Sequence, residues 1–504
     1  MALPTLFLET FVSSPKILTY GILLVAIGVT ATASVALYNI FLSPLSSYPG
    51  PKLSAATSIP YLNAVLTGST WSYVYKLHQK YGDVVRISPN ELSYTSAQAW
   101  RDINAHRLGK TLPDKEAAFY VDLPNGVPSL FSVKNKQHGR LRRPLAHAFS
   151  EKALRDQDDI IKTYIDGLIK GLKSKASNRE VVDMHGWLNW TTFDLMGSLS
   201  FGEDFGCLNN QQFHPWVKII FDMVRATAMM GAIRRYPGAQ KLIELLVPAA
   251  QKELQVKHQK MTDEKVARRL AMTTDRPDFM TCLLKNKDKQ EALSDAELSS
   301  GMFATIVAGS ETTATALSAT LNLLARNPYK MRKIQNEVRS AFNEDSEIDT
   351  QSTIPLKYMI AVINEAMRIY PPVPIGMPRV IPEGGLTVLG RYLPGGTIVS
   401  VHQYASYHDP KYWRRPHDFI PERWLDDPEY ADDNRKIFQP FSLGARNCIG
   451  QNLAYAELRS ICARLIFNFD FELADPYKDW FAGQRTYMIW EKGPLEMRIS
   501  HAKV

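Results

Sequence analysis

Ten residues near the end of the chain carry the most information about its fold: Phe441-Ser-Leu-Gly-Ala-Arg-Asn-Cys-Ile-Gly450. Two glycines bracket Cys448 in a tight loop, and a helical pattern follows over Leu453–Asn468. A cysteine just before a helix faces backbone N–H groups and the positive end of the helix dipole, which stabilise a thiolate. Arg446 adds positive charge nearby, and Phe441 shields the sulfur from water. For Cys448 taken alone, a buried structural cysteine is still the commoner interpretation, because free cysteines are often buried.

The surrounding pattern changes that balance. The stretch resembles the haem-binding loop of the cytochrome P450 superfamily, FxxGxRxCxG, and it matches at every fixed position, including Gly444. In that family the cysteine thiolate is the axial ligand of the haem iron and donates electron density that favours O–O cleavage. The resemblance therefore implies haem b as the cofactor, with Cys448 as the metal ligand and Phe441, Gly444 and Arg446 in the cofactor-binding loop.

A second motif, Ala308-Gly-Ser-Glu-Thr-Thr313, lies inside the longest predicted helix, Asp295–Arg326. Ala308 and Thr312 are four residues apart, so the Thr312 hydroxyl can bond the Ala308 carbonyl and open the helix locally. Ala308 and Gly309 are small enough to leave room for a diatomic ligand over a flat cofactor. The alternative is a threonine-rich buried helix face. The motif resembles the family's (A/G)Gx(D/E)T signature, which implies that Thr312 hydrogen-bonds the iron-bound peroxide and that Glu311 relays protons.

Glu365 and Arg368 form an ExxR motif in a predicted helix, Met359–Ile369, where their spacing places both on one face. Taken alone, they would be a surface ion pair worth well under ~1 kcal/mol. The resemblance implies instead a structural triad with Arg423, from Pro421-Glu-Arg-Trp424, that holds the cysteine loop in place. The family usually has phenylalanine where Trp424 stands.

Four basic residues are candidates for binding the two haem carboxylates. The family usually has WxxxR where this chain has His138-Gly-Arg-Leu-Arg142, so an imidazole replaces the indole and its charge depends on pH. Arg379 follows the ExxR helix, where the family places another such arginine, and Arg446 lies in the cysteine loop. Forked guanidinium donors suit carboxylates. For His138 a solvated basic face is the alternative.

The N-terminal region has no Asp, Glu, Lys, Arg or His between Ile17 and Pro51. Its apolar run exceeds the ~20 residues that a membrane-spanning helix needs. A cleaved signal peptide, for which Ala31-Thr-Ala33 has the right form, and a buried core helix are the alternatives. We expect an N-terminal tail over residues 1–16, a transmembrane anchor over 17–42, a stiff Pro-rich hinge over 43–52 and one domain over 53–504.

Helical periodicity dominates the body, and the strand-like runs are short and near its two ends. No Pro/Gly-rich boundary divides it, so we expect a single large domain, mainly α with minor β, of the cytochrome P450 type behind an N-terminal transmembrane helix. The remaining expected helices are Gln157–Lys173, Val217–Met229, Lys241–Thr262 (kinked or restarted at Pro248) and Pro328–Phe342, and the expected strands are Val84–Ser88, Leu92–Tyr94, Leu386–Val388, Ile398–His402 and Leu495–Ser500.

Composition excludes several other classes. The chain has 504 residues, 45% hydrophobic and 22% charged, which is ordinary for a globular protein. Its net charge of +8 is small for this length, so we expect no nucleic-acid partner; the charge suits a membrane surface or an acidic protein equally well. Cysteines are too few and too scattered for a zinc ribbon or a secreted disulfide scaffold: Cys207, Cys282, Cys448 and Cys462.

The resemblance covers nearly the whole chain in the family's order. It implies a haem-thiolate monooxygenase that inserts one oxygen atom from O2 into an apolar small molecule. No GxGxxG or P-loop fingerprint is present, so NADPH would act indirectly, through cytochrome P450 reductase, with cytochrome b5 as a further candidate partner. We expect a single-pass protein of the endoplasmic reticulum membrane with a cytosolic catalytic domain. Acidic reductase faces suit a candidate basic surface, for which a solvated charge run is the alternative: Lys134, Lys136, Arg140, Arg143 and Arg459.

The stretches Ser200–Leu208 and His138–Ser150 are similar to filamentous-fungal members that tailor polyketides, terpenoids or alkaloids, the group containing isotrichodermin hydroxylase. Two other functions remain open: a haem-thiolate isomerase or dehydratase, whose members often lack the acid–threonine pair, and a non-catalytic haem- or sterol-binding membrane protein. NADPH-dependent turnover separates the last from both enzymes. Asn189-Trp-Thr191 is a glycosylation sequon. Substrate-pocket residues are expected at 119–127, 223–230, 302–308, 373–377 and 487–489, which are rich in apolar side chains.

Overall fold

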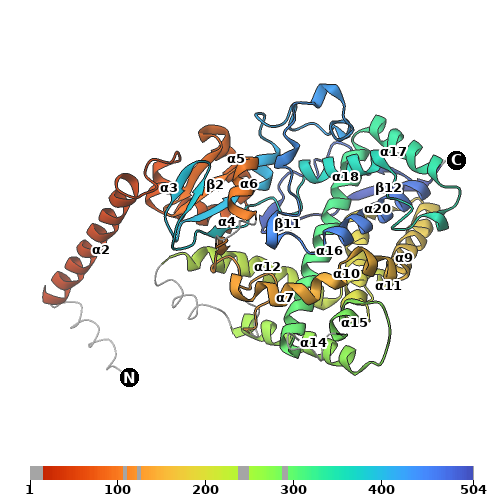
Figure 1. The fold of residues 1–504 in the computed structure, drawn as a ribbon, viewed down its shortest axis with the longest axis horizontal. Helices are drawn as coiled ribbons and strands as arrows, with labels where there is room; N and C mark the ends of the chain where they lie inside the picture. Colours follow the sequence, from red (N-terminus) through yellow and green to blue (C-terminus); the bar gives the residue numbers. More distant parts are fainter. Residues whose placement is uncertain (1–14, 106–110, 122–125, 237–248, 286–292, 503–504) are drawn as a thin grey trace, which may run out of the picture.

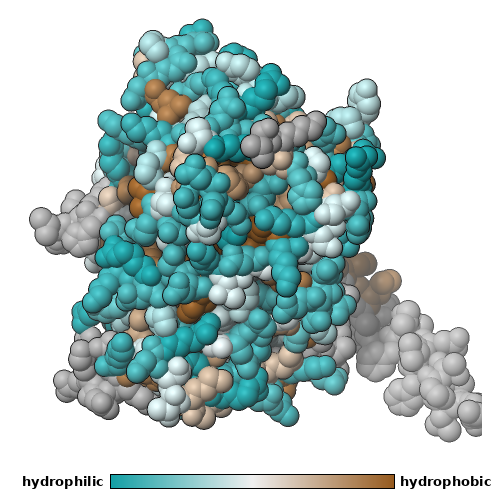
Figure 2. Space-filling view, turned by 90° about the vertical axis from the view of Figure 1, so that its right-hand side faces the viewer, coloured by the Kyte–Doolittle hydropathy of each residue, from teal (hydrophilic) through white to brown (hydrophobic). Residues whose placement is uncertain are grey.

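The computed structural model describes residues 15–105, 111–121, 126–236, 249–285 and 293–502. The expected kink at Pro248 and parts of the expected helix 241–262 and pocket loop 119–127 lie outside these residues. Figure 1 shows a long helix that projects from one side of a larger body, with β2 (Glu91–Tyr94) close to it and β12 (Glu496–His501) on the far side of the body. Figure 2 shows a face of the body on which hydrophobic residues form only small, separated patches.

The projecting helix is α2, Pro15–Phe41. Its segment Leu18–Phe41 has a mean hydropathy of 2.0 and is not buried against the body, so by length and composition it could cross a membrane. The connector that follows is docked on the body and is not an extended strap. Leu45 and Tyr48 are buried, and Arg86 donates to the backbone carbonyl of Asn39 at 2.8 Å. The stiffness expected from the prolines is therefore reinforced by packing.

A five-stranded sheet lies next to this connector, in the order β1-β2-β8-β5-β3. The β2 and β8 strands are parallel, and the other neighbours are antiparallel. The sheet thus joins segments that are about three hundred residues apart. Its strands and the helices packed near it are β1 (Val84–Ser88), β2 (Glu91–Tyr94), β3 (Asp114–Lys115), β5 (Arg379–Val380), β8 (Ile398–Val401), α3 (Lys52–Ala56), α4 (Ile59–Leu66), α5 (Thr70–Tyr81) and α6 (Ala97–Asn104).

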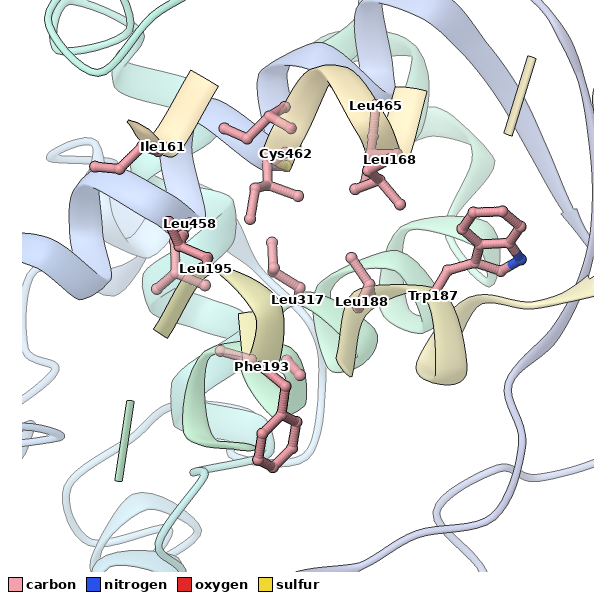
Figure 3. Packing of buried hydrophobic residues seen from close by; sticks show 14 of the residues in the cluster. Ile161, Leu168, Trp187, Leu188, Phe193, Leu195, Leu317, Leu458, Cys462 and Leu465 are labelled. Atoms are coloured by element: carbon pink, nitrogen blue, oxygen red, sulfur yellow. The ribbon is translucent and has the colours of Figure 1, made fainter. Parts of the chain in front are cut away.

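Four helices form the centre of the body: α9 (Asp158–Ser177), α10 (Met184–Phe201), α16 (Asp295–Ala325) and α20 (Gln451–Asn468). Figure 3 shows side chains from all four meeting in one cluster, among them Leu168, Leu188, Leu317 and Leu465. Each of these leucines is at most 1% exposed. Replacing such a leucine with alanine typically costs about 2–5 kcal/mol, so this cluster is the rigid base on which the site is built.

The α16 helix begins as expected from its sequence. The Ser294 hydroxyl accepts the Glu297 N–H at 3.3 Å, and the Glu297 carboxylate accepts the Ser294 N–H at 2.9 Å. This capping box satisfies two N–H groups that would otherwise lack partners. The other helices are α7 (Asn135–Ala148), α8 (Glu151–Asp156), α11 (Cys207–Asn210), α12 (Pro215–Arg234), α14 (Ala249–Ala271), α15 (Phe279–Leu284), α17 (Pro328–Ala341), α18 (Lys357–Ile369) and α19 (Gln403–Tyr407).

The five expected strands are present as β1, β2, β6, β8 and β12, whereas β3 and β5 of the five-stranded sheet and several strands of the smaller sheets were not predicted. Residues 181–183 lie in the middle of the helical region, yet they form an antiparallel pair with the C-terminal strand. Three residues are too few to show an alternating pattern, so this strand could be recognised only from its partner. The strands are β4 (Val181–Asp183), β9 (Phe469–Leu473) and β12 (Glu496–His501) in one sheet, and β6 (Leu386–Val388) with β7 (Arg391–Leu393) and β10 (Arg485–Tyr487) with β11 (Ile489–Glu491) as hairpins.

Asn189 of the glycosylation sequon is fully buried in α10. Its side chain donates to His185 and to the His185 carbonyl. Glycan attachment needs an exposed asparagine, so the folded protein cannot be modified at this position.

Candidate active site

The cysteine loop is fixed by backbone contacts. Gly444 has a φ of +80°, and a Cβ atom there would lie 1.9 Å from the Asn104 carbonyl oxygen at the end of α6. Glycine is therefore required at this position. The N–H of Cys448 donates to the Phe441 carbonyl at 2.8 Å, which closes the loop. The Phe441 ring packs against Tyr455 of α20, with 5.1 Å between ring centroids.

The thiol of Cys448 is surrounded by protein on most sides, but its side chain remains exposed. Burial raises its pKa, and the Gly450 N–H and Arg142 act in the opposite direction. The expectation that Arg446 supplies the positive charge is wrong. The Arg446 guanidinium is held away from the sulfur by Asn135 Oδ1 at 2.7 Å and by the Val133 carbonyl at 3.0 Å. Before a ligand binds, the thiol is thus the favoured form.

The middle of α16 presents an accessible face although the rest of the helix is buried. Ala308 is exposed and Thr312 is partly buried, whereas their neighbours Ser310 and Thr313 are buried. The Thr312 hydroxyl donates to the Ala308 carbonyl at 2.6 Å, as expected. Similar bonds recur along α16, so this bond is not distinctive by itself. The exposure of the Ala308–Thr312 face marks it as the part that borders an interior space.

Gly309 does not share that face. A Cβ atom on Gly309 would lie 2.7 Å from Cε of Met196 in α10. The glycine therefore allows close packing of α16 on α10, and the expectation that it leaves room for a ligand is wrong. Consecutive helix residues point about 100° apart, which places Ala308 on the open face and Gly309 against α10.

Glu311 forms a buried ion pair that the sequence did not indicate. Its carboxylate contacts the ammonium group of Lys492, just after β11, and both side chains are at most 3% exposed. Lys492 also donates to the Thr315 hydroxyl at 2.9 Å and to the Trp490 carbonyl at 3.2 Å. The second carboxylate oxygen of Glu311 is buried without a partner. Burial raises the pKa of Glu311, and Lys492 opposes that shift.

Basic side chains gather beside the cysteine loop. This group, here called the cationic cluster, consists of Lys115, His138, Arg142, Arg379 and Arg446. Burial, then Arg446 and Arg379, lowers the pKa of Lys115 to about 6. Among the described residues, Asp114 is the carboxylate in contact with the cluster, 3.3 Å from Arg446. With this pKa Lys115 is largely neutral at neutral pH, and the like charges of Arg142, Arg379 and Arg446 destabilise one another unless an anion lies between them.

The members of the cluster differ in how well they are bonded. Arg142 donates twice to Asn447, at 2.8 and 2.7 Å. One terminal nitrogen of Arg379 is buried without a partner. Burial, with the positive charge of Arg446 and Lys115, lowers the pKa of His138 to about 3, so its imidazole is neutral at neutral pH. The expected pH dependence of its charge is therefore confined to strongly acidic solution.

The structure brings the three expected triad residues together in a fully buried position. Glu365 contacts Arg368 through two bonds of 2.8 Å and Arg423 through one of 3.0 Å. Burial acts to raise the pKa of Glu365, but Arg368 and Arg423 hold it below its usual value. Trp424, the departure from the usual pattern, donates its indole N–H to Glu365 at 3.0 Å. The tryptophan therefore adds a bond to the triad.

The sequence profile of the family named Cytochrome P450 matches residues 49–490. The chain belongs to the cytochrome P450 family. It is 43% identical to the cytochrome P450 monooxygenase aclL of Aspergillus oryzae, over 97% of this chain and 99% of the relative. It is 42% identical to the monooxygenase astJ of the same species, over 92% and 93%, and 39% identical to averantin hydroxylase of Dothistroma septosporum, over 93% and 89%. The chain is accordingly a P450 monooxygenase, and its relatives are fungal.

Members of this family bind haem iron through a thiolate, and the residues present in this P450 fit that group. Haem b carries two carboxylates, and the cationic cluster offers several donors, including the unpartnered nitrogen of Arg379. Cys448 is exposed in the cysteine loop, next to the Asn447 that Arg142 contacts. Lys115, which pairs with Arg379 in the β3–β5 ladder, was missed because a lone lysine in a two-residue strand gives no sequence signal.

A narrow cavity of about 40 Å³ lies between α4, α12 and the β10–β11 hairpin of the P450. Four of the five expected pocket segments contribute to it, through Phe119, Thr227, Ala228, Ile375 and Met488 among others. The segment 302–308 does not line this cavity; part of it forms the open face of α16. Arg235, which was not expected, lines the cavity and pairs with Glu91 and Glu116. None of the expected site residues lines a larger surface groove near Lys330 and Glu422.

Proposed function

We propose that Cys448 would hold the haem iron through its thiolate and that the cationic cluster would bind the haem carboxylates. The observation that carries this proposal is the position of the exposed Cys448 thiol, which a rigid loop presents next to a group of mutually repelling cations. A metal ion deprotonates a coordinating thiol, which overcomes the burial that raises the pKa of Cys448. The carboxylates relieve the repulsion among Arg142, Arg379 and Arg446.

The protein residues then divide the work around the cofactor, which supplies oxygen activation when bound. The buried Glu365–Arg368–Arg423 triad fixes the segments that carry the cysteine loop and takes no part in the chemistry. Phe441 covers the sulfur side. Ala308 keeps the opposite side open, because a larger side chain there would occupy the exposed face of α16.

We further propose that Thr312 and Glu311 would hold and pass on protons at the open face of α16. The Thr312 hydroxyl lies on the open face of α16 and holds its hydrogen on the Ala308 carbonyl at 2.6 Å. Glu311 is the ionisable residue next to Thr312 in the helix. Its unpartnered oxygen can accept a hydrogen bond, and burial raises its pKa, so the carboxyl holds a proton more readily than an exposed glutamate does.

The substrate is an apolar small molecule of fungal secondary metabolism, of the polyketide, terpenoid or alkaloid type. Two observations support this: the chain is similar to fungal monooxygenases, and the cavity between α4, α12 and the β10–β11 hairpin, here called the access cavity, has a mainly apolar lining. One oxygen atom from O2 enters the substrate, and the other leaves as water. That averantin hydroxylase is among the relatives supports hydroxylation of such a scaffold.

The chain is anchored in the endoplasmic reticulum membrane by residues 17–42, through the hinge 43–52, with residues 53–504 in the cytosol. The exposed apolar length of α2 supports this arrangement. NADPH acts through cytochrome P450 reductase, and cytochrome b5 is a second candidate donor. The basic surface of Lys134, Lys136, Arg143 and Arg459 suits an acidic partner, but Arg140 contributes little because it pairs with Glu297.

The test is the absorption spectrum of the reduced, carbon-monoxide-bound protein in membranes, compared between wild type, Cys448→Ala and Cys462→Ala. Cys462 is buried in α20, the helix that follows the cysteine loop, and its replacement controls for the loss of a cysteine. We expect the strongly red-shifted Soret band of a thiolate ligand in wild type and Cys462→Ala, and its absence in Cys448→Ala. The same band in Cys448→Ala would exclude Cys448 as the ligand.

A further inference from the structure

Five oxidisable aromatic side chains form an unbroken path through the body. The ring centroids of Tyr370 and Trp490 are 4.4 Å apart, and those of Trp490 and Trp71 are 5.3 Å apart. Trp71 lies 4.7 Å from Tyr404, and Tyr404 lies 5.6 Å from Tyr75. These residues come from α5, α19, β11 and the segment after α18, so the path exists only in the folded protein.

The path leads from the interior to the surface. Tyr370 and Trp490 are buried, at 2% and 3% exposure, whereas Trp71, Tyr404 and Tyr75 are partly exposed. The inner end lies beside the proton-delivery residues: the Trp490 carbonyl accepts a hydrogen bond from Lys492, the ion-pair partner of Glu311.

The outer end has a proton acceptor. The Tyr75 hydroxyl is 3.1 Å from Nε2 of His417, a contact that is exposed to solvent. Partial burial, with Arg368 nearby, lowers the pKa of His417, so the imidazole is neutral at neutral pH and its Nε2 can accept. A tyrosine loses an electron far more readily when its proton can leave at the same time.

Packing alone does not require this composition. Phenylalanine fills a core equally well, and Phe149–Phe279 does so elsewhere in this protein. Every member of the path, however, is tyrosine or tryptophan, the two aromatic side chains that can be oxidised by one electron. A monooxygenase generates a strong oxidant from O2, and without a well-placed substrate that oxidant attacks the protein or the haem.

We propose that Tyr370, Trp490, Trp71, Tyr404 and Tyr75 form an escape route that carries oxidising equivalents from the active site to the surface when no substrate is oxidised. This rests on the proposed haem-thiolate function, which supplies the oxidant. In each step one electron moves inward along the path. Tyr75 gives up that electron and passes its phenolic proton to His417, which leaves a neutral tyrosyl radical and an imidazolium.

Electrons from soluble reductants complete the reaction. A soluble one-electron reductant, such as a thiol or ascorbate, returns an electron to the Tyr75 radical, and His417 returns the proton. Two such electrons, with two protons from solvent, reduce the activated oxygen to water. The net result is a slow oxidase activity that protects the site, and the protein itself is unchanged.

The test uses substrate-free holoenzyme treated with hydrogen peroxide, which generates the oxidant without reductase. Rapidly frozen samples are examined by electron paramagnetic resonance for a tyrosyl radical, and loss of the haem Soret band is followed in parallel. We expect a radical in wild type that ascorbate removes. In Tyr75→Phe we expect loss of this exposed radical and several-fold faster haem bleaching.

Tyr477→Phe is the matched control, because Tyr477 is 96% exposed and outside the path. It is expected to behave as wild type. His417→Gln is expected to shift the radical from Tyr75 to the inner rings, since the proton acceptor is gone. An identical radical signal and bleaching rate in wild type and Tyr75→Phe would overturn the escape route. A missing red-shifted carbon-monoxide band in wild type would instead refute the haem-thiolate function, so the two failures are distinguishable.

Discussion

The two sides of the catalytic interior are held together by different kinds of contact. Around the cysteine loop, buried charges are locked in place: Arg368 bonds to Glu365 and to the carbonyls of Tyr407 and Pro416, all at 2.7–2.8 Å. The access cavity is lined mainly by apolar side chains such as Ile375 and Met488, which can be exchanged without leaving a charge unpaired. The triad thus depends on a few residues whose replacement leaves a charge unpaired, whereas the lining of the cavity tolerates exchange.

The largest expected effect on stability comes from breaking the buried ion pair between Glu365 and Arg368. Arg368→Met leaves the Glu365 carboxylate buried with one partner fewer, which typically costs about 3–5 kcal/mol. We expect a large fall in the unfolding temperature and loss of haem from purified protein. Arg435→Met, which removes an ion pair to the exposed Asp426, is the control and costs less than about 1 kcal/mol. Similar melting curves for the two variants would contradict this contrast.

Lys492→Met tests the buried pair at the proton-delivery residues. Without Lys492 the pKa of Glu311 rises further, because burial is then unopposed. A carboxyl whose folded pKa exceeds its unfolded value stabilises the fold at low pH and loses that contribution as pH rises. We therefore expect the unfolding temperature of Lys492→Met to fall steadily from mildly acidic to alkaline buffer, with a loss on the order of 3 kcal/mol at neutral pH.

The control for this effect is the double variant Lys492→Met/Glu311→Gln, in which no carboxyl remains to ionise. Its unfolding temperature should lack the added pH dependence. If the single and double variants show the same slope, Glu311 is not the titrating group.

Low pH tests the contribution of His78, which joins α5 to the five-stranded sheet through Ser93. Burial lowers the pKa of His78 from 6.5 to about 4, and its ring nitrogens contact Gly82 and Ser93. The unfolded chain binds this proton more readily, so the stability is fully present above about pH 6.5 and is lost as pH falls toward about 4. In urea unfolding at acidic pH, the free energy of unfolding of His78→Gln should fall by on the order of 2 kcal/mol less than that of wild type. His147→Gln, at an exposed position, should not.

The smallest effect on stability is expected at the access cavity. Ala228→Leu places a larger side chain in the cavity, whereas Ala226→Leu lies on the same helix outside its lining. We expect Ala228→Leu to lower the affinity for a substrate about tenfold, measured from the spin-state shift that the bound substrate induces. Melting curves and the carbon-monoxide spectrum should stay close to wild type in both variants. Equal binding by the two variants would mean that substrates do not use this cavity.

The sequence predicted the parts of the site that lie close together along the chain. The Gly444–Cys448 loop, the Thr312–Ala308 bond and the capped start of α16 depend on neighbouring residues, and the structure contains all three. Most helix ends agree within a few residues, because apolar periodicity marks them directly.

What the sequence could not predict depends on partners from distant segments. Lys492 reaches Glu311 from 181 positions away, and Lys115 joins the cationic cluster through a two-residue strand. The same limit explains the errors at Arg446 and Gly309. Both were judged from their neighbours along the chain, but their orientation is set by Asn135 and Met196.

The sheet β4-β12-β9 also sets the order of events during biosynthesis. Met497 of β12 pairs with both Val182 and Leu473, so a strand made early waits for one made last. The loop around Gly444 likewise needs Asn104, which leaves the ribosome much earlier. The edges of β4 and β9 therefore need shielding from aggregation until β12 has been synthesised.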